Sequence, residues 1–176
     1  MRASAGGSGA LWGRGLLWAA LLTSACATPV SLAEGRWRAH AGGASIADLA
    51  ALDPGWRHTH EPGLLLAFRA PDDALACWMR QCRDASAPAR AEAHALLISL
   101  EAVVIEQEGA VAVGGAPGWS LRARALERGR AVTLKAVTRA EGGCTDDFLL
   151  VTPSALEPHE PSFDRWWASF EPGRRG

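Results

Sequence analysis

The sequence lacks a strong net charge, because its 18 Lys and Arg residues are set against 19 Asp and Glu residues. It therefore lacks the basic excess with which nucleic-acid-binding proteins neutralise phosphates, and we predict no nucleic-acid partner. Charged residues make up only 21% of the 176-residue chain, whereas hydrophobic residues make up 48%. Disordered proteins have the opposite balance, so a folded domain with an apolar core is expected.

Long hydrophobic runs are also missing. The N-terminal apolar run from Leu16 to Leu22 is too short for a transmembrane helix, which needs about 20 apolar residues. Arg2 and Arg14 precede this run and small residues follow it, which is the arrangement of a secretory signal. We therefore expect residues 1–25 to be a signal peptide and the rest of the chain to be exported.

The stretch LLTSAC at the end of this run resembles the signal of bacterial lipoproteins, although Thr23 stands where that family usually has Leu. The resemblance implies that Cys26 is diacylated, becomes the mature N-terminus and anchors the chain, since two acyl chains give stable membrane attachment. Because Ala27 and not Asp follows, the resemblance favours the outer membrane, facing the periplasm. The alternative is an ordinary signal peptide cut near Ala27, which would leave Cys26 discarded or free.

Small and polar residues dominate the segment after the signal, and they predict a flexible tether over residues 26–54. Within that segment, the apolar patch Ile46–Leu52 predicts a turn of helix that Pro54 ends. A single folded domain is expected over residues 55–171, followed by a short tail over residues 172–176.

One helix is expected inside the domain. Ser86-Ala87-Pro88 is typical of a helix start, and apolar residues recur after it at helical spacing, which predicts an amphipathic helix over residues 88–101. Strand patterns bounded by turn residues lie on both sides of it, and Gly109 separates two of them. The expected strands are 56–60, 64–69, 75–81, 103–108, 110–113, 119–125, 132–136 and 148–152.

The clearest alternation of apolar and polar residues flanks Arg128-Gly129. With these two as the turn of a hairpin, apolar residues share one face and Arg122 lies opposite Lys135 on the other face. A slip of one residue would mix the two faces. The apolar pairs of this register are Ala125–Val132, Ala123–Leu134 and Leu121–Ala136.

A terminal helix is expected from Pro161-Ser162, with Phe163, Trp166, Trp167 and Phe170 at helical spacing and packed against the sheet. Adjacent helical residues point about 100° apart. Trp166 and Trp167 therefore cannot face the same point, and a partly exposed ring there would mark a contact surface.

Strands, a helix, an antiparallel meander and a final helix, in that order, predict the α+β class with helices covering an antiparallel sheet. This order, with Gly55-Trp56 near the domain start and the aromatic terminal helix, resembles the PsbP-like sandwich fold. It is also similar to a group of uncharacterised bacterial lipoproteins, in which the segments HALLISLE and VIEQE and the Gly-Cys segment before an Asp have counterparts. The resemblance covers about residues 55–171 and implies a fold, not a reaction.

Three cysteines remain once Cys26 is assigned to lipid, an odd number for an oxidising compartment. Cys82 lies at a strand end and Cys144 in a turn, so we prefer a disulfide between these two. Pairing of Cys77 with Cys144 is the competing arrangement. No zinc site is expected, because Cys77 and Cys82 lack zinc-type spacing and no His cluster follows them.

Two groups of residues could carry a function. The first is His58, His60 and Glu61, where two imidazoles on one side of a strand could ligate a metal if a third ligand came from elsewhere. They support an alternative function as a metal-dependent or hydrolytic envelope enzyme. No nucleophile or phosphate-loop signature is present, and we expect no cofactor or metal.

The second group is the basic strip, which consists of Arg122, Arg124 and Lys135. Neutralisation by Glu106 and Glu108 is the simpler role for these cations, and contact with lipid phosphates or an acidic partner is the functional one. The function expected from the sequence is therefore that of a lipid-anchored, non-catalytic accessory protein of the cell envelope. It would bind an envelope protein or lipid through its sheet face and terminal helix.

Overall fold

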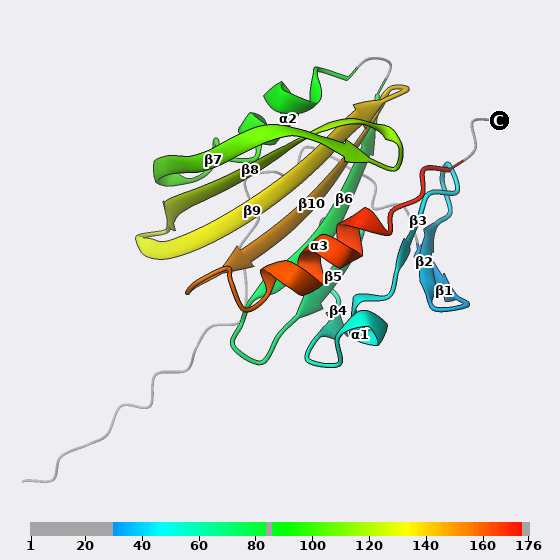
Figure 1. Ribbon diagram of the computed structural model, residues 1–176, viewed down its shortest axis with the longest axis horizontal. Coiled ribbons are helices and arrows are strands. Elements are labelled where there is room, and N and C mark those ends of the chain that lie inside the picture. Colours follow the sequence, from blue (N-terminus) through cyan, green and yellow to red (C-terminus); the bar gives the residue numbers. More distant parts are fainter. Residues whose placement is uncertain (1–29, 84–85, 174–176) are drawn as a thin grey trace, which may run out of the picture.

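The computed structural model describes residues 30–83 and 86–173. Its largest element is a seven-stranded antiparallel sheet with the order β4-β5-β6-β10-β9-β8-β7, and a second, three-stranded sheet has the order β1-β2-β3 (Figure 1). The strands of the large sheet are β4 (Arg57–Thr59), β5 (Leu66–Arg69), β6 (Leu75–Cys82), β7 (Glu101–Val113), β8 (Ala116–Glu127), β9 (Arg130–Glu141) and β10 (Cys144–Thr152). The remaining elements are β1 (Val30–Ala33), β2 (Arg36–Ala39), β3 (Ser45–Ala47), α1 (Leu49–Leu52), α2 (Ala89–Ala95) and α3 (Glu160–Ala168).

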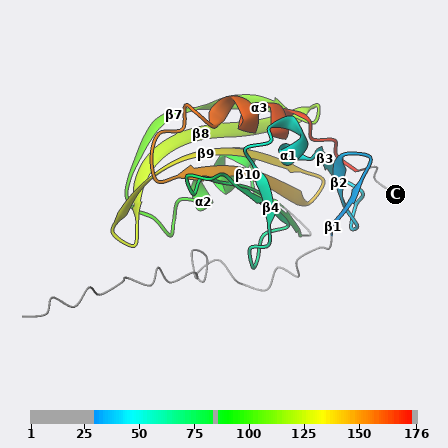
Figure 2. The same ribbon diagram turned by 90° about the horizontal axis from the view of Figure 1, so that it is seen from below.

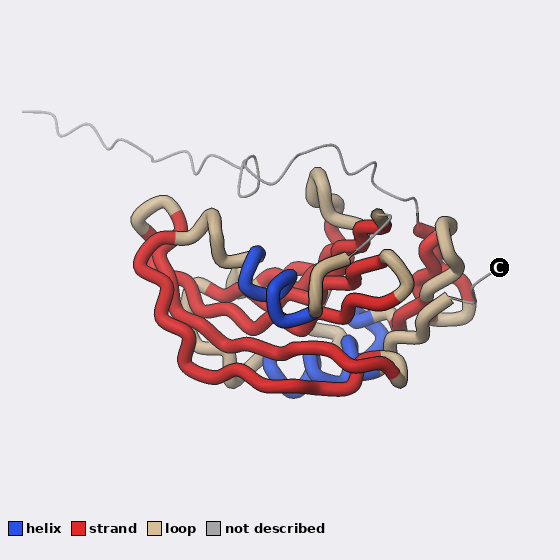
Figure 3. The backbone as a smooth tube through the Cα atoms, turned by 90° about the horizontal axis from the view of Figure 1, so that it is seen from above, coloured by secondary structure: helices blue, strands red, loops and turns tan. Residues whose placement is uncertain are grey.

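Helices cover both faces of the large sheet. Helices α1 and α3 lie on one face and α2 lies on the other, while the small sheet stands at one end (Figures 2 and 3). The α3 face holds an aromatic core in which Trp78, Phe148 and Trp166 are fully buried. The α2 face holds an aliphatic core that includes Leu121, Leu149 and the thiol of Cys77. Because side chains alternate along a strand, each central strand contributes to both cores.

The hairpin register agrees with the sequence prediction residue for residue. Strands β8 and β9 pair Leu121 with Ala136 and Arg122 with Lys135, with the turn at Arg128-Gly129. Strand β10 follows antiparallel to β9, as expected. The two strands predicted around Gly109 are one continuous strand, β7, because Gly109 stays paired with Ser120 and the register shifts lie nearer the start of the strand.

The predicted tether is wrong for the part that the structure describes. Residues 30–54 form β1, β2, β3 and α1, and Ala39, Ala44, Ile46 and Leu49 have no exposed surface. The small side chains that suggested a flexible segment allow this small sheet to pack closely on the aromatic core. Residues 1–29, with the expected signal peptide and Cys26, lie outside the described residues.

The central helix is shorter than predicted. Helix α2 ends at Ala95, where a helix was expected to reach residue 101. Strand β7 begins at Glu101, which pairs with Leu126 of β8. The apolar residues after the helix therefore belong to a loop, in which Leu97 is buried and Ile98 is 83% exposed.

The terminal aromatic helix packs on the sheet as predicted. In α3 and just beyond it, Phe163 and Trp166 are fully buried and Phe170 is 3% exposed. The rings of Phe148 and Phe170 meet edge to face with their centroids 5.2 Å apart, an arrangement that stabilises aromatic pairs beyond the area they bury.

Gly118 of β8 offers a test of the close packing between β8 and its neighbouring strands. A methyl group at this position would lie 2.7 Å from the carbonyl oxygen of Thr138 and 2.9 Å from Val113 Cγ2. We expect Gly118→Ala to lower the free energy of unfolding by about 1–3 kcal/mol. Gly109→Ala is the matched control, because nothing lies within 4 Å of its added carbon. Urea denaturation measures both variants, and equal midpoints would contradict the close approach at Gly118.

Candidate functional site

The basic strip lies beneath α3, where acidic side chains neutralise it. Lys135 Nζ is 2.7 Å from a carboxylate oxygen of Glu160 and 2.8 Å from one of Asp164. Arg122 is 3.4 Å from Glu160 and also pairs with Glu157. Two adjacent cations on the sheet are therefore matched by carboxylates from α3 and the loop before it.

These ion pairs make most of the strip an internal link between sheet and helix. The side chains of Arg122 and Lys135 are only 26% and 14% exposed. Arg124 differs, because its side chain is 66% exposed, although it also pairs with Glu106. Of the three cations, Arg124 alone presents most of its side chain to solvent.

The two adjacent tryptophans have different environments, as their helical spacing requires. Trp166 is fully buried and donates a hydrogen bond from its indole nitrogen to the carbonyl oxygen of Ala47, at 3.0 Å. Trp167 is half-buried and donates to Asp164 at 2.9 Å. The expectation that Trp166 belongs to a contact surface is therefore wrong, and Trp167 is the ring with exposed area.

Two members of the predicted histidine group have structural contacts, whereas His60 is exposed. The ring of His58 stacks on Trp37 with centroids 4.5 Å apart. Glu61 accepts a hydrogen bond from Arg69 at 2.8 Å. In residues 30–83 and 86–173, no three His, Cys, Asp or Glu side chains are grouped so that they could hold a metal ion. The third ligand that this alternative needed is thus missing from the described part of the chain.

The cysteines form the pair preferred from the sequence. Cys82 and Cys144 face each other at the ends of β6 and β10 and are joined by a disulfide, with their Cα atoms 4.0 Å apart. Cys77 is a buried free thiol on the α2 face. Burial raises the pKa of the Cys77 thiol to about 12, so it stays protonated and is a poor nucleophile.

A buried ion cluster lies on the α3 face of the central strands. Asp146 has no exposed surface and accepts hydrogen bonds from Trp78 at 3.1 Å, Arg80 at 3.0 Å and Arg139 at 3.3 Å. Burial raises the pKa of Asp146, although both guanidinium groups oppose that change. The sequence showed only an adjacent acidic pair, whereas strand alternation places Asp146 in one core and Asp147 in the other.

Asp147 lies on the α2 face, where it accepts fewer side-chain hydrogen bonds than Asp146 does. Its side chain accepts a hydrogen bond of 2.7 Å from the hydroxyl of Thr138. Burial, helped by the negative charge of Glu92 on α2, raises the pKa of this carboxyl to about 7, although the hydrogen bond from Thr138 opposes that change. A carboxylate in an apolar core is costly, so this group binds a proton near neutral pH.

Helix α2 is attached to the sheet through Glu108 of β7. One oxygen of Glu108 lies 2.7 Å from His94 Nε2 and accepts a 3.0 Å hydrogen bond from the Trp119 indole. The other oxygen accepts a bond from Arg90 at 2.8 Å. These bonds, led by that from His94, lower the pKa of Glu108. The group resembles a catalytic cluster in composition, but its polar atoms bind one another and hold the helix.

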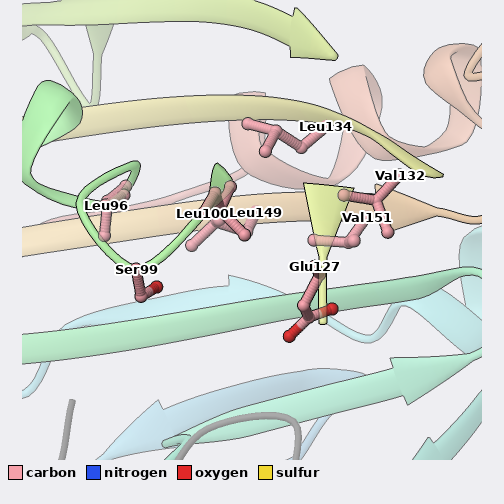
Figure 4. A pocket seen from close by; sticks show the side chains of 8 residues that line it. All are labelled: Leu96, Ser99, Leu100, Glu127, Val132, Leu134, Leu149 and Val151. Carbon is pink, nitrogen blue, oxygen red and sulfur yellow. The ribbon is translucent and has the colours of Figure 1, made fainter. Parts of the chain in front are cut away.

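A small cavity lies between the loop after α2 and the end of the sheet. Its volume is about 20 Å³, and its lining includes Leu96, Leu100, Val132 and Glu127 (Figure 4). This volume holds about one water molecule, so it is too small for an organic ligand. Burial raises the pKa of Glu127 in its wall. Ile98, nearby in the chain, is exposed.

No family model matches the chain, and no curated protein matches its sequence. Cyanobacterial PsbP (CyanoP) from Synechocystis sp. PCC 6803 is 16% identical, with a TM-score of 0.54 over 78% of this chain and 91% of that chain. The described domain has a PsbP-like fold. LpqN of Mycobacterium tuberculosis is 13% identical, with a TM-score of 0.51 over 68% of this chain and 79% of its own. These similarities confirm the predicted fold class and, at such identities, concern the fold alone.

The disulfide should contribute strongly to stability. It joins residues separated by 62 positions, and closing a loop of that length stabilises a fold by about 4 kcal/mol in the chain-entropy account. We expect the double variant Cys82→Ser/Cys144→Ser to lose about this much in urea denaturation. Reduced wild-type protein should unfold at the same midpoint as the double variant. A wild-type unfolding midpoint that reduction does not change would contradict the expected contribution of the disulfide to stability.

Asp147 should make stability depend on pH. Its folded-state pKa of about 7 exceeds the ordinary 3.8, so between these values the folded protein holds a proton that the unfolded chain lacks. The contribution of Asp147 to stability is then greatest at acid pH and falls as pH rises toward 7, by up to about 4 kcal/mol in total. Above pH 7 the loss is complete.

The variant Asp147→Asn should remove this slope and raise stability at pH 8, as measured by urea denaturation from pH 4 to pH 8. Asp73→Asn is the matched control, since the Asp73 side chain is 79% exposed. An unchanged slope in Asp147→Asn would show that another group binds the proton.

Proposed function

We propose that this chain is a lipid-anchored, non-catalytic binding protein of the cell envelope. The observation that carries the proposal is the position of Cys26 in the stretch LLTSAC, four residues before the first strand of the domain. Acylation of Cys26 would fix the whole described domain to a membrane surface. Among the described residues, none of the helices has the length and apolar content needed to cross a membrane.

The described domain supports binding over catalysis. Several groups that could carry out chemistry are buried or engaged in structural contacts: Cys77 is buried, His58 stacks on Trp37, and Glu108 binds His94. Both sheet faces are covered by helices, so a partner would meet the outer surface. The fold shared with CyanoP and with LpqN, a protein described as involved in cell envelope biogenesis, is compatible with this role.

The partner is proposed to be an envelope protein or lipid. Exposed apolar side chains suit such a contact, and the largest exposed fractions belong to Ile98 at 83% and Val104 at 54%. Since Ala27 follows Cys26, the outer membrane, facing the periplasm, is the proposed location.

Substitution of the anchor residue tests the proposal. We expect Cys26→Ser to abolish acylation and to move the protein from the membrane fraction to the soluble fraction. The matched control is Cys77→Ser, which removes a cysteine without removing the proposed anchor and should leave fractionation unchanged. Mass spectrometry of the purified wild-type protein should find a diacylated Cys26 at the N-terminus. An unmodified N-terminus elsewhere, with fractionation unaffected by Cys26→Ser, would overturn the anchor.

A further inference from the structure

The attachment between the proposed anchor and the domain is short. Strand β1 begins at Val30, four residues after Cys26. A fully extended chain spans at most 3.6 Å per residue, so Val30 lies within about 14 Å of the acylated residue. With the proposed anchor, the β1–β2 hairpin (Val30–Ala39) is therefore held close to the bilayer.

The hairpin carries side chains suited to a lipid surface. Leu32 of β1 is 49% exposed and is one of the exposed large hydrophobic residues of the described domain. Arg38 of β2 is exposed, and no carboxylate of the described residues lies within ion-pair distance of it. Arg36 differs, because Glu171 neutralises it at 3.3 Å. Glu34 at the turn is the acid of this hairpin.

The backbone of the hairpin limits how deeply it can sit. Strand β1 is the outer strand of the small sheet, so one edge of its backbone is unpaired within that sheet. Unpaired backbone groups are costly in hydrocarbon but are satisfied among water and lipid headgroups. Leu32 can thus enter the boundary between headgroups and acyl chains, while Arg38 attracts anionic headgroups.

The hairpin also determines what the rest of the domain faces. The small sheet lies at one end of the molecule and the β8–β9 turn at the other (Figures 1 and 2). A domain held by its small sheet would direct the β8–β9 turn away from the bilayer.

We infer that the β1–β2 hairpin docks by its outer edge, strand β1, on the anionic headgroup layer of the membrane, and thereby holds the domain in one orientation. Leu32 and Arg38 project from opposite faces of the hairpin and are its contacts on the two sides of that edge. This inference rests on the proposed lipid anchor. In this orientation the small sheet contacts the lipid, and the opposite end of the large sheet remains accessible to an envelope partner.

Site-directed fluorescence on the full acylated chain tests the orientation. A polarity-sensitive fluorophore is attached in the Cys77→Ser background at Leu32→Cys or, as the matched control, at Ile98→Cys. The protein is reconstituted into phosphatidylcholine vesicles with or without phosphatidylglycerol. We expect emission from position 32 to shift to the blue and to be quenched by headgroup spin-labelled lipid, and emission from position 98 to remain that of an aqueous site.

The charge contribution is tested separately. Arg38→Gln should lower the docked-to-undocked ratio at position 32 about five-fold in vesicles with phosphatidylglycerol, and should have little effect without it. Arg128→Gln is the control, because Arg128 is exposed at the β8–β9 turn. Failure of the acylated chain to bind any vesicle would overturn the proposed anchor. Stable binding with equally aqueous signals at positions 32 and 98 would overturn the docking alone.

Discussion

The central strands of the large sheet are buried on both faces, and the rest of the structure depends on that constraint. In a strand, neighbouring side chains point to opposite faces, so each residue of β10 is committed to one of two cores. Asp146 enters the α3 side, where Arg80 and Arg139 meet it, and Asp147 enters the α2 side, where the Thr138 hydroxyl meets it. Two identical side chains adjacent in sequence therefore have very different electrostatic surroundings.

Three charged residues on this sheet attach the covering helices. Lys135 and Arg122 form ion pairs with carboxylates of α3 and its preceding loop. Glu108 forms hydrogen bonds with His94 and Arg90 of α2. Such pairs cost side-chain entropy and desolvation, so they specify where a helix sits more than they add to stability. A strip of like charge on one face of a sheet is consequently weak evidence for an external acidic partner when a helix with acidic side chains lies over it.

The accuracy of the sequence predictions followed the range of the interactions involved. The register of β8 and β9 was predictable, because two alternating strands joined by a two-residue turn leave one pairing that separates apolar from polar faces. The fate of residues 30–54 was not predictable, since small residues are equally typical of linkers and of strands packed closely on a core. The end of α2 was also missed, because pairing of Glu101 with Leu126 takes precedence over helical spacing. The ion cluster around Asp146 depends on contacts across three strands, which no local pattern reveals.

The placement of Cys77 has a consequence for oxidative folding. Cys77 pairs across the sheet with Leu149, and Cys82 pairs with Cys144. Cys77 and Cys82 also project from opposite faces of β6. Once β6 and β10 have aligned, the Cys77 thiol is enclosed beside Leu149 and cannot attack the bond at the strand ends. Thiol–disulfide exchange is thereby limited to chains in which the sheet has not yet formed. Cys77 is thus kept from exchanging with the Cys82–Cys144 disulfide once the sheet has formed.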